Sequence, residues 1–98
     1  MREKDIERKL REAVIKAGGV CYKFVSPGNN GVPDRVIILN GVVLFAEIKA
    51  PGKKPSIIQE IRIREMRNRG AWVEVIDSIE FVNYIIEKIL KCRVYLKD

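Results

Sequence analysis

The fold of this chain is decided by residues 31–49, which read GVPDRVIILNGVVLFAEIK. Two short apolar runs, 36–39 and 42–46, flank the pair Asn40-Gly41. Asn-Gly between such runs is the strongest short-range hairpin signal, because both residues tolerate the positive φ angles of a two-residue turn. We therefore predict two antiparallel strands joined at residues 40 and 41.

The register of this hairpin places two acidic residues opposite each other. Asp34 faces Glu47, and alternation puts Glu47 and Lys49 on one face of the strand with Ile48 on the other. Opposed carboxylates repel each other unless a cation lies between them, and oxygen ligands suit Mg²⁺, which needs few protein groups. The pattern predicts a metal site for phosphoryl chemistry, in which Lys49 orients or deprotonates a water or stabilises charge on a phosphate. The alternative is a set of solvated charges at a strand end.

The other elements follow from periodicity and turn residues. An apolar stripe predicts a helix over 3–17, and a second stripe predicts a helix that begins after Asp77-Ser78. Residues 20–25 and 71–76 have the composition of strands, and the alternating tail 92–98 could add an edge strand. The order α-β-β-β-α-β-α predicts an α/β fold over a single domain, 1–98, with a mixed β-sheet flanked by helices.

The helix predicted from Ser56 to about Arg69 is apolar on two sides. Ile57, Ile58 and Ile61 point one way, and Ile63 and Met66 point another, together with Gln59. Such a helix often has two partners, the core and another subunit. We expect a homodimer that uses the Ile63/Met66 side of this helix or the C-terminal tail.

Composition narrows the classes of function. The net charge of +6 favours an anionic partner such as nucleic acid, and the absence of histidine excludes a Cys/His zinc cluster, a Ser-His triad and an imidazole base. No apolar run is long enough to cross a membrane, and no signal peptide is evident. We expect a cytoplasmic protein in which Cys21 and Cys92 are reduced thiols, with no membrane partner and no organic cofactor.

Two glutamates of the first helix lie near its apolar stripe. Glu3 falls about 20° and Glu7 about 60° from the centre of the stripe on a helical wheel. A carboxylate at the edge of a buried stripe is unusual unless something cationic meets it, although acids are also favoured in the first turns of a helix. Glu3 and Glu7 are therefore both candidates for the acidic site.

Pro33-Asp34, twelve intervening residues and Glu47-Ile48-Lys49 resemble the PD-(D/E)XK signature of restriction-endonuclease-like nucleases. With Gly31, Val32 and Gln59 the pattern is similar to the virus-type replication-repair nuclease (VRR-NUC) domain, over residues 3 to about 78. The resemblance implies a restriction-endonuclease-like core.

The resemblance also implies roles for individual residues. Asp34, Glu47 and the Ile48 carbonyl would hold one or two Mg²⁺ or Mn²⁺ ions, and Lys49 would position or deprotonate the attacking water. A glutamate early in the first helix joins the site in this family; the register matches Glu3, with Glu7 in reserve. Gln59 matches a glutamine placed near the scissile phosphate or the catalytic lysine.

Small stand-alone members of the family, from phages and bacteria, resemble Holliday (four-way) junction resolvases that act as homodimers. We therefore expect branched or duplex DNA as the partner, in the cytoplasm of a bacterium or a phage-infected host cell. The loop containing Asn30 and the basic loop with Lys53 and Lys54 are the expected DNA contacts. The alternatives are a nuclease for flap, nicked or linear DNA, and a non-catalytic basic nucleic-acid-binding module.

Overall fold

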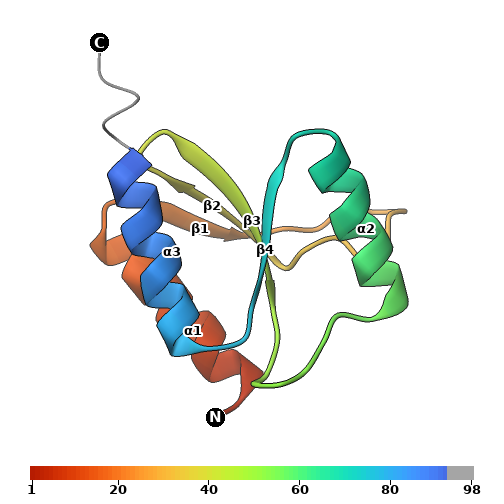
Figure 1. Ribbon diagram of the computed structural model, residues 1–98, viewed down its shortest axis with the longest axis horizontal. Coiled ribbons are helices and arrows are strands. Elements are labelled where there is room, and N and C mark those ends of the chain that lie inside the picture. Colours follow the sequence, from red (N-terminus) through yellow and green to blue (C-terminus); the bar gives the residue numbers. More distant parts are fainter. Residues whose placement is uncertain (93–98) are drawn as a thin grey trace.

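The computed structural model describes residues 1–92 and confirms the predicted order of elements (Figure 1). The helices and strands are α1 (Glu3–Lys16), β1 (Val20–Lys23), β2 (Arg35–Leu39), β3 (Val42–Ile48), α2 (Ile57–Asn68), β4 (Trp72–Ile76) and α3 (Ile79–Cys92). The strands form one sheet in the order β1-β2-β3-β4; β4 runs parallel to β3, and the other neighbours are antiparallel. The α/β class with a mixed sheet is thus confirmed.

The β2–β3 hairpin has the predicted register. Asn40 and Gly41 have φ angles of 56° and 81°, as a two-residue turn with two positive φ angles requires. Arg35 pairs with Ala46, and Leu39 pairs with Val42 next to the turn. The next position outward on each strand is Asp34 and Glu47, so the turn alone fixes which residues meet at the far end of the hairpin.

The sheet is covered on both faces, and most of the core lies on one of them. Figure 1 shows α1 and α3 on one side of the sheet and α2 on the other. The main core lies between one face of the sheet and the helices α1 and α3. The helices contribute the predicted apolar stripes, which are Ile6, Leu10 and Val14 from α1 and Val82, Ile85 and Ile89 from α3. Burial of these two stripes holds the N-terminal end of α1 close to the ends of β2 and β3.

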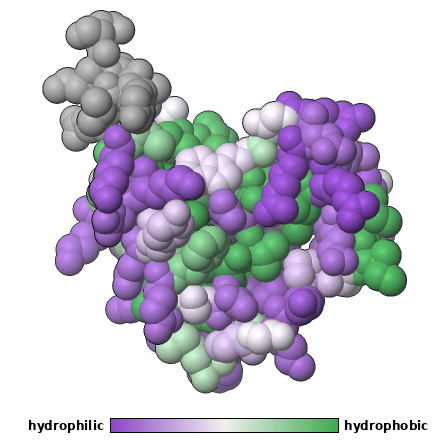
Figure 2. Space-filling view, in the orientation of Figure 1, coloured by the Kyte–Doolittle hydropathy of each residue, from purple (hydrophilic) through white to green (hydrophobic). Residues whose placement is uncertain are grey.

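Helix α2 packs against the sheet with the apolar side that we expected to be free for a dimer contact. Ile63 is buried with 4% exposed, whereas Ile57, Ile58 and Ile61 are 78%, 43% and 50% exposed. The prediction that the Ile63/Met66 side forms a dimer contact is therefore wrong, because Ile63 packs toward β4 of its own chain. Figure 2 shows one hydrophobic area on the outer side of α2, where the helix begins. The tail, the alternative contact, lies beyond Cys92 and outside the described residues.

Two further features of the described chain concern membrane crossing and the cysteines. Among residues 1–92 no helix combines the length and the apolar character that a membrane crossing requires. Cys21 and Cys92 are free thiols, and both are partly buried.

Candidate nuclease active site

Asp34 is fixed between the two strands that flank β2. Its backbone carbonyl accepts a hydrogen bond from the Phe24 N–H at 2.8 Å. Its carboxylate oxygen Oδ2 accepts a hydrogen bond from the Ile48 N–H at 2.9 Å. Asp34 therefore ties the end of β3 to the start of β2, and one carboxylate oxygen is left for another partner.

Glu47 is the buried acid of the site. Its side chain is 1% exposed, its Oε2 lies 3.3 Å from the Lys49 Nζ, and its Oε1 has no hydrogen-bond partner. Burial raises the pKa of Glu47 to about 7; the negative charges of Asp34 and Glu3 also raise it, whereas the Lys49 ammonium lowers it. An oxygen left unsatisfied in a buried carboxyl group is costly, so this position favours a proton or a cation.

The two glutamates of α1 have different surroundings. Glu7 forms ion pairs with Arg11 at 3.1 Å and with Arg35 of β2 at 2.6 Å. Glu3 forms no ion pair among residues 1–92, and its charge acts on Glu47. Glu7 therefore attaches α1 to the sheet, and Glu3 is the glutamate whose charge remains available to the site.

A cavity of about 270 Å³ opens beside Asp34. Glu3, Lys4 and Glu7 line it from α1, and Lys23, Phe24, Asp34, Arg35 and Ile48 line it from the sheet and its loops. Among residues 1–92 no group of three or more His, Cys, Asp or Glu side chains is arranged to hold a metal ion. An ion held by two carboxylates and a backbone carbonyl is still compatible with Mg²⁺, because Mg²⁺ commonly keeps several waters.

The remaining predicted residues lie outside the lining of this cavity. The Gln59 Oε1 accepts a hydrogen bond from the Ser56 N–H at 2.8 Å, and the Gln59 N–H donates to the Ser56 Oγ at 3.3 Å, so Gln59 caps the start of α2. The Asn30 carbonyl accepts a hydrogen bond from the Arg62 Nε at 2.8 Å. Lys53 and Lys54 are exposed in the loop after β3. The proposed roles of these four residues in DNA binding or catalysis stay predictions.

The structure brings three cationic side chains to the cavity that the sequence did not place there, namely Lys4, Lys23 and Arg35. Lys23 is the cross-strand partner of Arg35, and Lys4 follows Glu3 on α1. The loop of residues 24–34 separates β1 from β2. Such a long loop does not fix which residues of the two strands pair, as the two-residue turn does for β2 and β3. The β1–β2 register, and with it the position of Lys23, was therefore not accessible from the sequence.

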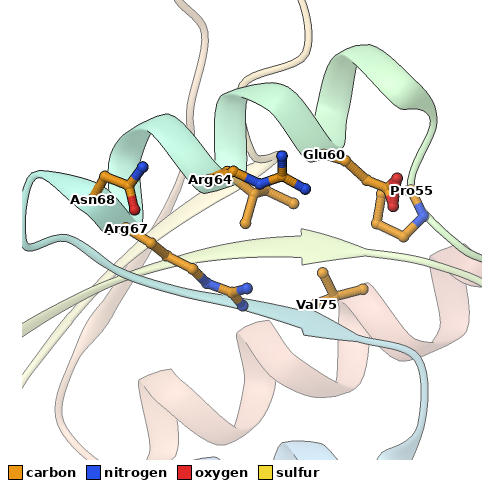
Figure 3. A pocket seen from close by; sticks show the side chains of 7 residues that line it. Pro55, Glu60, Arg64, Arg67, Asn68 and Val75 are labelled. Atoms are coloured by element: carbon orange, nitrogen blue, oxygen red, sulfur yellow. The ribbon is translucent and has the colours of Figure 1, made fainter.

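A second cavity, of about 350 Å³, lies between α2 and β4 (Figure 3). Arg64, Arg67 and Asn68 of α2 line it, opposite Val75 of β4. Arg67 donates from Nε and Nη2 to the Val73 carbonyl at 3.1 and 2.7 Å. Neither Asp34 nor Glu47 lines this second cavity, and the guanidinium of Arg67 is bound to the backbone of the edge strand β4.

The chain is similar to two other proteins along most of its length. It is 48% identical over 79 residues to a protein named "Putative nuclease p44" from Acyrthosiphon pisum secondary endosymbiont phage 1, which covers 80% of this chain and 85% of that protein. A solved structure described as a VRR_NUC domain matches with a TM-score of 0.80 and 33% identity, over 87% of this chain and 94% of that one. No sequence profile of a known family matches the chain.

Proposed function

Because this chain belongs to the VRR-NUC family of nucleases, we propose that it is a metal-dependent endonuclease that hydrolyses phosphodiesters in branched DNA. The preferred substrate in this proposal is the four-way junction, cut by a homodimer in the cytoplasm of a bacterium or a phage-infected cell. The observation that carries the metal chemistry is the buried Glu47 Oε1, which has no partner in a site that also contains Asp34 and Glu3.

The donor set fits a hard divalent cation. Asp34, Glu47 and the Ile48 carbonyl would hold Mg²⁺ or Mn²⁺, with Glu3 completing the acidic shell directly or through water. When bound, such an ion stabilises the negative charge that develops on the phosphate during hydrolysis.

The protein groups around this set have separate tasks. The Ile48 N–H holds the Asp34 carboxylate in one orientation through the 2.9 Å hydrogen bond. The Lys49 Nζ lies 3.3 Å from the Glu47 carboxylate. As an ammonium group Lys49 can position the attacking water, and as a neutral amine it can accept the proton of that water. The buried wall around Glu47 excludes water on one side, which strengthens these interactions.

A homodimer would supply the selectivity for branched DNA. Two sites related by a two-fold axis can cut opposed strands of a junction. Ile57, Ile58 and Ile61 support this part of the proposal, because they form an exposed apolar side of α2 on the described surface. A light-scattering measurement that gives a monomer at micromolar concentration would remove the basis for paired incisions.

The test is a cleavage panel with end-labelled DNA. A four-way junction, a flap, a nicked duplex and a linear duplex are incubated with Mg²⁺, with Mn²⁺ and with EDTA. We expect paired incisions in the junction with either metal, slower cutting of the other substrates and none with EDTA.

The Asp34→Ala variant is the control for contaminating nuclease, and junction binding is measured in parallel. Preferred cutting of flap, nicked or linear DNA would reassign the substrate within the same chemistry. Binding that persists without cutting in either metal would identify a non-catalytic module, in contradiction to the proposal.

A further inference from the structure

The cavity beside Asp34 has a cationic wall as well as an acidic one. Lys4 extends from α1, and Lys23 lies at the end of β1. Among residues 1–92 neither lysine forms an ion pair, whereas the neighbouring Arg35 is held by Glu7 at 2.6 Å. The charges of Lys4 and Lys23 are therefore available to a ligand.

These lysines contribute little to the fold. Both are exposed, and neither belongs to the buried core. The cavity is also lined by Phe24, whose ring packs against Phe45 with centroids 5.1 Å apart. The cavity thus combines two free ammonium groups with one fixed apolar ring, an arrangement that suits a phosphate attached to a sugar.

The size of the cavity limits what it can take. Its volume of about 270 Å³ lies just under the roughly 300 Å³ at which pockets for small-molecule ligands begin. The cavity has room for one nucleotide unit of a DNA strand but not for a larger ligand.

We propose that this cavity holds the DNA sugar-phosphate unit next to the scissile phosphodiester, with Lys4 and Lys23 binding its phosphate. The inference rests on the proposed function, because it assumes that the bond cut lies at Asp34 and Glu47. Asp34 forms part of the cavity wall, so a strand whose scissile phosphate lies at the acids passes into the cavity with its next nucleotide.

Electrostatics favour such a contact. Glu3, Asp34 and Glu47 place negative charge where a polyanion has to approach, and Lys49 is already paired with Glu47. Cations that meet the neighbouring phosphate offset this repulsion and fix the register of the strand. In this scheme Lys4 and Lys23 bind the strand beside the bond that breaks and take no part in breaking it.

The experiment uses the full chain with a Lys4→Ala/Lys23→Ala double variant. The matched control is Lys9→Ala/Lys16→Ala, which removes the same charge from α1 at a hollow on the α3 side of the helix. Thermal melts of both variants verify folding. We expect the first variant to raise KM about tenfold with little change in kcat, and to reduce the salt slope of log KM by about 0.7–0.9 for each lysine.

A chemical substitution in the DNA tests the location of the contact. After the cut is mapped, single uncharged methylphosphonates replace the phosphates on either side of it. We expect one replacement to slow the wild type about tenfold and to have no further effect on the Lys4→Ala/Lys23→Ala variant.

Two outcomes would overturn the inference. One is a Lys4→Ala/Lys23→Ala variant whose KM and salt slope equal those of the Lys9→Ala/Lys16→Ala control. The other is a methylphosphonate effect that persists undiminished in the double variant. If the wild type cuts no DNA, the proposed function fails by itself, and equilibrium binding of the same oligonucleotides by the same variants decides the role of the two lysines.

Discussion

Two cavities of the described chain show how differently a protein can use charged side chains. The cavity between α2 and β4 contains Arg67, whose guanidinium donates two hydrogen bonds to the Val73 carbonyl. Asp34 and Glu3 line the other cavity, and their charges act on the buried Glu47, whose Oε1 has no hydrogen-bond partner among residues 1–92. A charge whose hydrogen bonds are satisfied stabilises the fold, whereas an unsatisfied buried carboxyl oxygen favours a proton or a cation. We therefore expect Arg67 in the first cavity to act on stability and the acids at the second to act on cleavage.

Substitutions at the acidic site should have the largest effect on cleavage. Asp34→Ala and Lys49→Ala should each lower the cleavage rate about 100–1,000-fold or more, because each removes a group that acts on the reacting phosphate. Arg64→Ala, in the other cavity, is the matched control and should cut at the wild-type rate. Junction binding and thermal melts are measured alongside; loss of binding in step with cleavage would make Asp34 and Lys49 structural.

The pKa of Glu47 predicts an unusual dependence of stability on pH. Because the pKa is raised from 4.5 to about 7 by folding, the folded state binds more protons than the unfolded state between these pH values. The free energy of unfolding without metal should therefore fall by about 3 kcal/mol as the pH rises through this window.

Urea denaturation between pH 4.5 and 8 in EDTA measures this dependence. Glu47→Gln carries no titrating carboxyl group and should lack this part of the slope. An equal slope in wild type and variant would show that Glu47 titrates in its normal range.

The loop that precedes Asp34 depends on one glycine. Gly31 has a φ of +87°, and a Cβ there would lie 2.8 Å from the Ile58 carbonyl oxygen of α2. Gly31→Ala should lower the free energy of unfolding by about 2–3 kcal/mol and reduce cleavage, because the loop has to move away from α2. Gly28→Ala is the matched control: its φ is +84°, but a Cβ would meet nothing within 4 Å, so it should cost only about 1 kcal/mol. Equal losses in the two variants would exclude the contact with α2 as the cause.

The smallest effect is expected at the cavity between α2 and β4. Arg67→Ala should lower the free energy of unfolding by about 1–2 kcal/mol, because it removes the donor to the Val73 carbonyl, and should leave cleavage per folded molecule unchanged. Chemical denaturation and cleavage assays of the same samples test both parts. A large loss of cleavage in a folded Arg67→Ala protein would erase the distinction between the two cavities.

Much of the fold was accessible from the sequence because its signals are local. The capping residues Ser56 and Ser78 precede α2 and α3 as predicted, and each Oγ accepts a backbone N–H of its helix. The stripes of α1 and α3 each form a single apolar face, so only one orientation toward the sheet buries them.

The prediction for α2 was wrong for a physical reason. Its two apolar sides are similar in composition, so the periodicity does not decide which one is buried. The position of β4 decides it, by offering Ile63 a neighbouring surface and leaving Ile57 and Ile61 exposed. The choice between Glu3 and Glu7 was equally undecided, because it depends on Arg35, which approaches Glu7 from another element.

The sequence by itself determined that Asp34 and Glu47 occupy facing positions, because the Asn40-Gly41 turn counts residues outward along both strands. Only the tertiary structure decided what surrounds them: the burial of Glu47, the pairing of Glu7 with Arg35 and the free charges of Lys4 and Lys23. A turn fixes register through backbone geometry a few residues away. Burial and charge at a site depend on side chains that arrive from α1 and β1, and their positions follow from the packing of the whole sheet.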